Sequence, residues 1–449
     1  MRYTARFLYQ KQDVMKKTRT IVVRSLAVTL WLFLLLFAIA LANSSIELTA
    51  SGVHQRLLLS LGSVSAAINT YAGTGDEVRM PGFLDGPIVR KKADGSWNAT
   101  WFCEDEVQHL AGSGSVLAIE CAGQTRHYPV ARNPEIPNPV FDTPGDTLIL
   151  SNIEGNVRFL GAGLASLQVA DEAGNWSYGR NHLVIAGDAV GRGRDAFAVL
   201  WRLYGLSLQA QEAGGSVHLL LGNQEQNLLR GNTLEVNRDH LYALVRMGGQ
   251  AQAFGPDTLI GQWLRLQPVV IKSGKTVITH AGINPVVADA GLTVHKLNGA
   301  MRAYWSGDML NKMELDAVLG PAGVTQYRGY FKDGERRYTR ATTTQVSCVL
   351  AHFGANAIVA GHTLVDSVRP FHDGAVWAVD VNSNTARPEA LLIRNGAPVV
   401  VSTGVSRQLD DNLQRRTTRA FSLVAASDIK MLQGLVTSNL ALSRIADPY

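Results

Sequence analysis

The chain has 449 residues, 46% of them hydrophobic and 18% charged, with a formal net charge of +5. A chain of this length can hold two or three domains, or one large domain with appendages. Residues 1–24 carry seven Lys or Arg and one Asp, which is a charge of +6 and leaves −1 for residues 25–449. A nearly neutral body excludes nucleic-acid binding through a broad basic face.

The segment 25–42 follows this basic tail and contains no charged residue. A helix of that length rises about 27 Å, close to the hydrocarbon thickness of a bilayer. We therefore predict a single-pass transmembrane anchor with residues 1–24 in the cytoplasm and residues 43–449 outside it, in the periplasm if the cell is bacterial. Ala40-Leu41-Ala42 also fits a signal-peptide cleavage site, so a cleaved signal remains the alternative.

The three cysteines bear on the compartment. Cys103 and Cys121 lie in two β-like runs, Trp97–Cys103 and Val116–Cys121. In an oxidising space they can form a disulfide, and the alternative is a pair of buried thiols. Cys348 lies in an apolar, helix-like run and is predicted to belong to the core.

The residues after the anchor change character twice. Residues 43–75 are mostly small and apolar, and they are predicted to continue the anchor as a helical spacer. Residues 76–145 contain Gly, Pro and short alternating runs, which predicts a small β-rich accessory domain. It ends in a Pro-rich linker, Asn133–Gly145.

Strand and helix patterns alternate from Asp146 onward, which predicts an α/β domain over residues 146–402, with sheet layers covered by helices. A closing hairpin is expected over 385–402, with Asn395-Gly396 as its turn. Residues 403–449 form a C-terminal extension without a recognisable motif. The expected strands are Leu148–Leu150, Leu183–Ala186, Val217–Leu221, Val277–His280, Ala357–Ala360 and Val376–Val381, and the clearest helices are Val157–Ala170 and Ala196–Ala213.

Five of these strands end in a polar cluster beside a glycine. Glycine lets the backbone turn sharply and approach an ion or a phosphate closely, and ligands bind at the carboxyl ends of strands in α/β proteins. The clusters are Asn152–Gly155, Gly187–Gly193, Gly222–Glu225, His280–Gly282 and Gly361–Thr363.

In order and spacing, these clusters resemble the signatures of the calcineurin-like metallophosphoesterases, including the bacterial Shewanella-like protein phosphatases. The family pattern is Asp-x-His-Gly, Gly-Asp-x-x-Asp-Arg-Gly, Gly-Asn-His-Glu, His-x-Gly and Gly-His-Thr, and the match covers residues 146–385. The resemblance implies β-sandwich layers flanked by helices. It also implies two divalent metals (Mn, Fe or Zn) that share a bridging carboxylate and activate a hydroxide.

The resemblance assigns a metal role to six residues. Asp188 matches the bridging carboxylate, and Asn223, His280 and His362 complete the ligands of one ion. The second ion requires Asp and His where this chain has Asn152 and Glu154, so its binding is in doubt. Glu can bind hard ions or manganese, whereas Asn lacks the neutralising charge. A lone histidine is more often structural, and Asn152 and Glu154 can equally be turn and capping residues.

Two further departures concern proton transfer. The family's general acid, a histidine, is replaced by Gln224, and the carboxylate that orients it is replaced by Gly191. Arg192, Arg230 and Arg328 are candidate phosphate clamps, and the alternative for each is a structural or surface salt bridge. His182 and His218 fall outside the signatures and are predicted to be structural.

Together these features predict a membrane-anchored, extracytoplasmic phosphoesterase with a modified metal site. Its substrate would be a phosphorylated small molecule or a phosphoprotein. The alternative is a catalytically inactive pseudophosphatase that binds a ligand or partner, and a purely structural zinc or manganese site is a third possibility. The loss of general acid catalysis, typically worth about 10²–10⁴-fold, restricts the hydrolase to substrates with good leaving groups or to substrates that supply their own acid.

Overall fold

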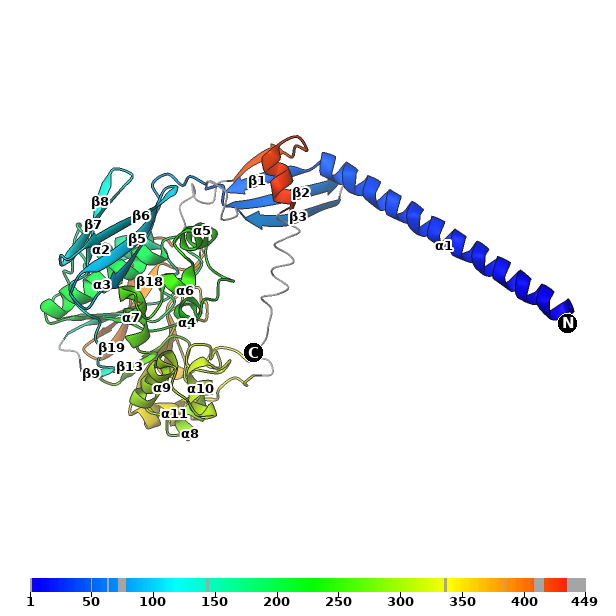
Figure 1. Cartoon of the computed structure of the whole chain (residues 1–449). Coiled ribbons are helices and arrows are strands. Elements are labelled where there is room, and N and C mark those ends of the chain that lie inside the picture. The colour runs from blue at the N-terminus through cyan, green and yellow to red at the C-terminus, as the bar shows by residue number, and fades with distance from the viewer. Residues whose placement is uncertain are drawn as a thin grey trace. The chain divides into compact units, whose positions relative to one another are not determined.

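The computed structural model describes residues 2–49, 51–62, 64–71, 78–142, 145–334, 337–383, 385–407 and 416–433 (Figure 1). The chain divides into two compact units. Unit 1 comprises Met1–Val78 and Asn412–Tyr449, and unit 2 comprises Arg79–Asp411.

Unit 1 consists of a long helix and an antiparallel sheet in the order β20-β1-β2-β3. The elements are α1 (Arg2–Ala42), β1 (Ser45–Thr49), β2 (His54–Leu61), β3 (Val64–Tyr71) and β20 (Arg416–Ala420). The predicted helical spacer over 43–75 is therefore wrong in its described residues. Gly52 and Gly62 adopt left-handed conformations, with φ of +74° and +61°, and these turns fold the segment into strands.

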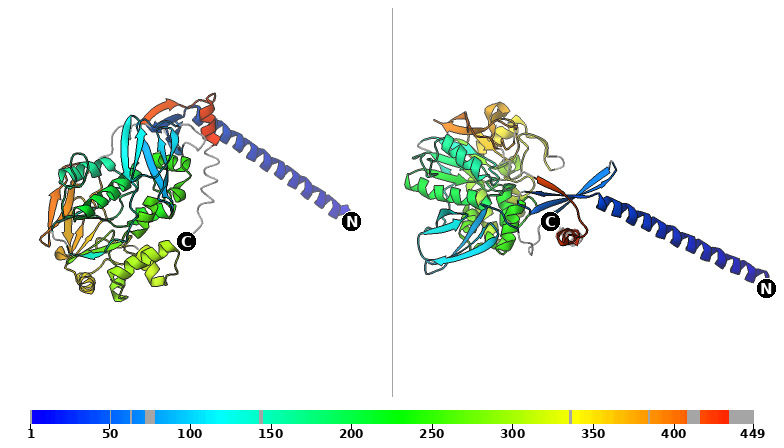
Figure 2. Two further views of the ribbon diagram at one scale, coloured as in Figure 1. Left: turned by 60° about the vertical axis from the view of Figure 1, so that its left-hand side comes forward. Right: turned by 90° about the horizontal axis from the view of Figure 1, so that it is seen from above.

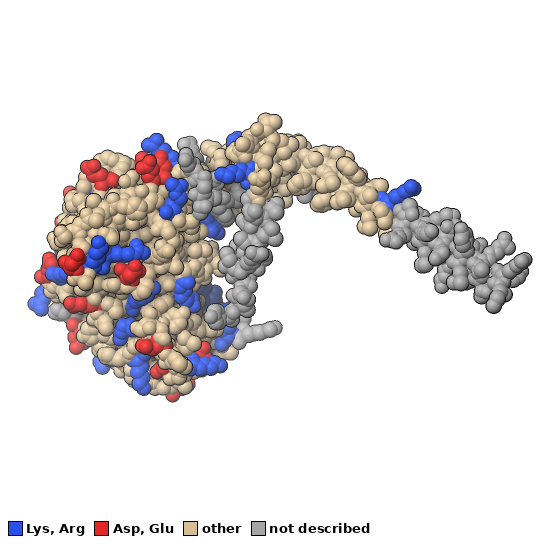
Figure 3. Space-filling view, in the orientation of Figure 1, with Lys and Arg blue, Asp and Glu red and all other residues tan. Residues whose placement is uncertain are grey.

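The last turn of α1 packs into the core of this sheet. Leu41 is buried with Ile46, Leu57, Phe421 and Met431. Within α1, residues Val22–Ala42 are long and apolar enough to cross a membrane, and a signal sequence near the N-terminus would have the same character. The described surface of this helix is almost free of charged side chains (Figure 3).

Unit 2 is built on two sheets. One has the order β12-β11-β10-β18-β19 and the other β16-β17-β15-β14-β13-β9. The strands of the first are β10 (Thr147–Leu150), β11 (His182–Ile185), β12 (Ser216–Leu219), β18 (Glu389–Arg394) and β19 (Ala397–Ser402). Those of the second are β9 (Val140–Phe141), β13 (Val270–Ser273), β14 (Thr276–Thr279), β15 (Ala357–Ala360), β16 (Arg369–Phe371) and β17 (Val376–Ala378).

The two sheets share one hydrophobic core, so unit 2 is a sandwich. Ile149 and Val184 of the first sheet pack in the same buried cluster as Ile278 and Val359 of the second. Helices flank the sandwich, as Figures 1 and 2 show. They are α2 (Val157–Ser166), α3 (Ala196–Glu212), α4 (Asn223–Leu229), α5 (Arg238–Arg246), α6 (Gln250–Ala253), α7 (Leu259–Leu266), α8 (Pro285–Asp289), α9 (Val294–Ser306), α10 (Lys312–Leu319) and α11 (Thr343–Phe353), with a short 3₁₀ turn, η1 (His372–Gly374).

The β-rich region before the sandwich forms hairpins along one side of unit 2 (cyan in Figure 2). They comprise β4 (Leu84–Lys91), β5 (Trp97–Cys103), β6 (Glu106–Gly112), β7 (Val116–Cys121) and β8 (Gln124–Pro129). Cys103 and Cys121 form a disulfide between β5 and β7, which settles that alternative. The predicted linker, Asn133–Gly145, also contributes a strand to the second sheet, since β9 within it pairs with β13.

Two smaller predictions have opposite outcomes. The closing hairpin is confirmed, because Asn395 and Gly396 both have positive φ and join Arg394 to its partner Ala397. The core assignment of Cys348 is wrong, because that thiol is exposed. The buried residues of α11 are Val346, Val349 and Phe353, a helical spacing that leaves position 348 facing outward.

The surface of unit 2 carries no broad field of one charge on the face seen in Figure 3, where basic and acidic side chains are interspersed.

The sheet topology determines where functional side chains meet. β10, β11 and β12 are parallel neighbours, as are β14, β15 and β17. Their carboxyl ends therefore bring the loops that follow them to one edge of the sandwich.

Candidate metal centre

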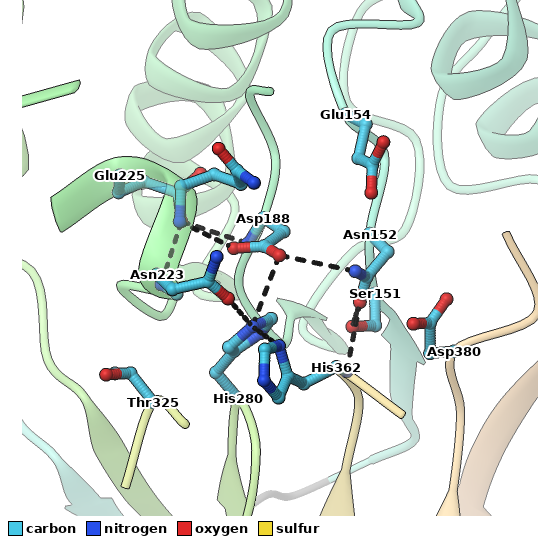
Figure 4. Close-up of polar contacts among 12 residues, drawn as sticks. Ser151, Asn152, Glu154, Asp188, Asn223, Glu225, His280, Thr325, His362 and Asp380 are labelled. Carbon is cyan, nitrogen blue, oxygen red and sulfur yellow. Dashed lines mark hydrogen bonds and ion pairs between the residues drawn. The ribbon is translucent and has the colours of Figure 1, made fainter. Parts of the chain in front are cut away.

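The loops after β10, β11, β12, β14 and β15 converge at this edge and present the side chains shown in Figure 4. Four of these residues have left-handed backbones: Asn152, Glu154, Asp188 and His362 have φ of +52°, +50°, +52° and +60°. Such conformations cost energy in non-glycine residues and are concentrated at functional sites. The turns at the strand ends therefore aim these side chains at a common point.

Two glycines allow the loops to approach so closely. A Cβ on Gly187 would lie 2.5 Å from Nδ1 of His280, and a Cβ on Gly222 would lie 2.3 Å from Oδ1 of Asp188. No side chain fits at either position. Gly187 and Gly222 are therefore required because each packs directly against a candidate ligand, His280 and Asp188 respectively.

Asp188, His280 and His362 offer ligand atoms that all lie within 4.8 Å of one another. Nε2 of His280 is 3.3 Å from Oδ2 of Asp188, 3.2 Å from Nδ1 of His362 and 3.0 Å from Oδ1 of Asn223. The structure therefore brings together the four residues expected to hold one ion. Asp188, His280 and His362 are all buried.

The hydrogen bonds of His280 define which nitrogen is free to bind a metal. Its Nδ1 lies 2.9 Å from the carbonyl oxygen of Ala186, which can only accept, so Nδ1–H is the donor. In the neutral ring Nε2 then carries a lone pair, as in histidine metal ligands oriented by a carbonyl. Burial disfavours the charged ring, but Asp188, the Ala186 carbonyl and Glu225 together more than offset this effect and raise the pKa of His280. Burial and His280 lower the pKa of His362.

Four potential acceptor atoms thus crowd one point: Asp188 Oδ2, Asn223 Oδ1, His280 Nε2 and His362 Nδ1. Such a cluster is stable only around a cation or a shared proton, because lone pairs that face one another repel. Mixed nitrogen and oxygen ligands suit Mn, Fe or Zn. The residues at this half of the site therefore fit a divalent metal.

The other half of the site is arranged differently. Oδ1 of Asn152 accepts hydrogen bonds from the Ser151 hydroxyl at 2.6 Å and from the backbone N–H of His362 at 3.2 Å. Because the N–H of His362 can only donate, the amide NH₂ of Asn152 must point the other way. It donates to Oδ2 of Asp188 at 3.3 Å. Asn152 consequently offers a hydrogen-bond donor where the family has a metal-binding carboxylate.

Glu154 and Asp380 are two acids at this second half (Figure 4). Burial raises the pKa of Glu154 to about 7, with Asp188 and Asp380 adding to the rise and Arg192 opposing it. Burial also raises the pKa of Asp380. Asp380 follows β17 and was missed in the sequence, although a lone Asp between Val379 and Val381 was a usable signal.

The positions of the lost general acid and its partner remain neighbours. A Cβ on Gly191 would lie 3.3 Å from Cγ of Gln224 and 3.5 Å from Cγ of Glu154. The Gln224 side-chain amide donates a hydrogen bond to the carboxylate of Glu235. Glu235 was also missed, because it belongs to the loop after α4 and to none of the motifs.

The candidate phosphate-binding arginines occupy different places. Arg192 is largely exposed, and its guanidinium lies 3.9 Å from both Glu154 and Glu235, at the rim of the site. The positive charge of Arg328 acts on His362 and helps to lower its pKa. Arg230 is exposed and donates to Asn227 at the end of α4.

Glu225 and the two outlying histidines have structural surroundings. The fully buried carboxylate of Glu225 accepts from the backbone N–H groups of Asp188, Val190 and Gly222 at 2.9, 3.1 and 2.8 Å. It thereby joins the loops after β11 and β12. His182 and His218 lie in the strands β11 and β12, and they contact each other at 3.2 Å.

No protein-family model matches the chain, and no curated protein matches it significantly in sequence. Solved structures do match. A cold-active protein-tyrosine phosphatase of a psychrophilic Shewanella species is 29% identical, with a TM-score of 0.65, over 75% of this chain and 99% of its own. A second structure of a cold-active protein tyrosine phosphatase is 28% identical, also with a TM-score of 0.65, over 75% of this chain and 97% of its own.

These likenesses confirm the expected relationship to the calcineurin-like phosphoesterases and the predicted α/β sandwich. They support a phosphoesterase-like protein with a possible metal-binding group at Asp188, His280 and His362.

Proposed function

We propose, from this relationship, that the chain is a metal-dependent phosphoric ester hydrolase held at a membrane by its N-terminal helix, with unit 2 outside the cytoplasm. The observation that carries the proposal is the cluster of four acceptor atoms formed by Nε2 of His280 and the atoms of Asp188, Asn223 and His362 around it. A divalent ion held by Asp188, Asn223, His280 and His362 would polarise a phosphoryl oxygen and supply a hydroxide nucleophile at neutral pH.

The chain's own residues would bind substrate and limit its range. Arg192 at the rim carries an exposed guanidinium suited to phosphate oxygens. Gln224 occupies the place of the general acid and cannot donate a proton as an acid. The leaving oxygen must therefore depart without protonation by residue 224, which favours phenolate (pKa about 10) over the far more basic alkoxides. We accordingly propose aryl phosphates, including phosphotyrosine, as preferred substrates.

Leu41 supports an uncleaved anchor. It is buried in the core of unit 1 with Ile46 and Leu57, and cleavage after Ala42 would remove it. The Cys103–Cys121 disulfide supports an oxidising, extracytoplasmic location for unit 2.

The test uses the full chain in detergent, supplied with Mn²⁺, and measures bound metal and p-nitrophenyl phosphate turnover. The double variant His280→Ala/His362→Ala should lose both the metal and the turnover. The matched control His109→Ala/His127→Ala removes two exposed histidines of the hairpins and should retain both. If the unmodified chain turns over p-nitrophenyl phosphate no faster than the His280→Ala/His362→Ala variant, the protein is not a hydrolase of this kind.

The paired loss at Gly191 and Gln224 favours a second candidate, a pseudophosphatase that binds a phosphorylated ligand without hydrolysing it. This candidate requires metal binding that disappears in His280→Ala/His362→Ala while turnover is absent in the unmodified chain. Tight binding of inorganic phosphate to the metal-loaded protein, without hydrolysis of any aryl phosphate, would identify it.

A further inference from the structure

The side-chain amide of Asn152 presents a hydrogen-bond donor to the Asp188 oxygen that a second ion would bind. The amide NH₂ of Asn152 is directed at Oδ2 of Asp188 at 3.3 Å, on the carboxylate that would bridge two ions. Its orientation is maintained by the His362 N–H and the Ser151 hydroxyl on the opposite side of the amide. An ion bound at this position would have to displace or rotate Asn152 against both of these hydrogen bonds.

A buried arginine provides positive charge on the same side. Arg407, 7% exposed, donates from Nη1 to the backbone carbonyl of Asn152 at 2.6 Å. Its guanidinium carbon lies 4.3 Å from the ring centre of Phe159. The carbonyl of Arg407 in turn accepts from the Asn156 side chain at 3.3 Å. These contacts tie Arg407 to the loop after β10 that carries Asn152 and Glu154.

The charges around Arg407 explain why the cation is retained. Burial lowers the pKa of Arg407 to about 10, while Asp380 and Glu154 favour its charged form. Its Nε and Nη2 have no hydrogen-bond partner in the described part of the chain. An unpartnered buried guanidinium is costly, and the attraction of Asp380 and Glu154 offsets only part of that cost. Glu154 and Asp380 thus have a positive neighbour without a metal ion.

We propose that this chain has a mononuclear metal centre, in which the Asn152 amide and the Arg407 guanidinium together replace the second cation. The single ion is held by Asp188, Asn223, His280 and His362. Asn152 hydrogen-bonds the carboxylate oxygen that a second ion would bind, and Arg407 adds a buried positive charge against the backbone of Asn152. The inference rests on the proposed metal centre but requires no turnover.

The experiment strips the full chain in detergent of metal, reloads it with Mn²⁺, and measures the ratio of manganese to protein together with the electron paramagnetic resonance spectrum. We expect a ratio near 1 and the six-line signal of an isolated Mn²⁺. A ratio near 2 with an exchange-coupled spectrum would overturn the inference and leave the metal centre standing. A ratio near 0 would overturn both.

Paired variants test Arg407 itself. Asn152→Asp restores a carboxylate, but with Arg407 present the ratio should stay near 1. Asn152→Asp/Arg407→Met removes the cation and should raise the ratio to about 2, with a coupled spectrum. Asn152→Asp/Arg407→Lys retains a positive charge and should stay near 1. Equal ratios in the Met and Lys variants, measured on protein with matching circular dichroism, would show that Arg407 does not replace an ion.

Discussion

Positions 191 and 224 differ in how readily each could regain a group for proton transfer. Gly191 has φ +148°, a conformation that strains residues with a side chain, so reinstating an Asp there carries a cost. Position 224, in contrast, already faces a carboxylate, since Gln224 donates a hydrogen bond to Glu235. A histidine introduced at 224 would find its orienting partner in Glu235 without any change at 191.

We therefore predict that Gln224→His increases turnover of alkyl phosphates by about 10²-fold, the lower end of the usual gain from general acid catalysis. The increase should decline at alkaline pH as the new imidazole loses its proton. Initial rates on an alkyl and an aryl phosphate measure the effect, with Gln224→Asn as the matched control. Equal rates for the His and Asn variants, or a gain that survives Glu235→Gln, would contradict this role for Glu235.

The strands β11 and β12 lead to the candidate metal centre and also contain a buried histidine pair. Their carboxyl ends lead to Asp188 and Asn223, whereas His182 and His218 are packed together within the strands. The ring of Phe141 in β9 stacks on His218 at 4.3 Å between centres. Burial lowers the pKa of His182 to about 4 and that of His218 to about 3. Both rings are therefore neutral in the folded protein at neutral pH.

This pair makes folding stability depend on pH. Between about pH 4 and 6.5 the unfolded chain binds protons at these histidines that the folded chain excludes, so stability falls as the pH falls. Each such proton is worth up to about 1.4 kcal/mol per pH unit. The Tm of unfolding should fall when the pH is lowered from 7 to 5, and we predict that this fall is smaller in His182→Gln/His218→Gln than in the unmodified chain. The exposed-site control His127→Gln should retain the full loss, and identical losses in all three proteins would contradict the assignment.

At the scale of the whole chain, the two units combine an N-terminal apolar helix with a disulfide-bonded body. Unit 1 joins two segments that are far apart in sequence, since β20 pairs with β1 and Leu41 is buried in a core with Phe421 and Met431. Unit 2 contains one disulfide and one exposed thiol, Cys348. The oxidation state of the three cysteines in cells therefore reports the compartment of unit 2.

Cells are lysed directly in denaturant and the protein is treated with a maleimide-polyethylene glycol reagent. We predict one label per chain without reduction and three labels after reduction. Cys348→Ser should then show no label before reduction and two labels after it. A gel shift measures both results. Three labels without reduction would place unit 2 in a reducing compartment and contradict the extracytoplasmic proposal.

Much of the fold and one half of the site could be predicted from the sequence. The strand ends and the α/β alternation depend on local patterns of apolar strands followed by polar residues and glycine. The metal role of Asp188, Asn223, His280 and His362 was implied by the resemblance of these strand ends to the family signatures. Such patterns are local, so they are readable without knowing which segments pack together. The predictions of a helical spacer and of a buried Cys348 were wrong for a related reason. Composition alone did not show that the chain turns at Gly52 and Gly62, and it did not show which face of α11 is buried.

The sequence by itself predicted candidate metal ligands after successive strands, and it showed that residues 152, 154, 191 and 224 depart from the related pattern. Only the tertiary structure decided what those departures mean. Asp380, Glu235 and Arg407 lie outside the motifs, and they join the site because β17, the loop after α4 and the loop after β19 meet there. Whether a position holds an ion depends on the summed charge and hydrogen bonding of all its neighbours, and those neighbours are brought together only by folding.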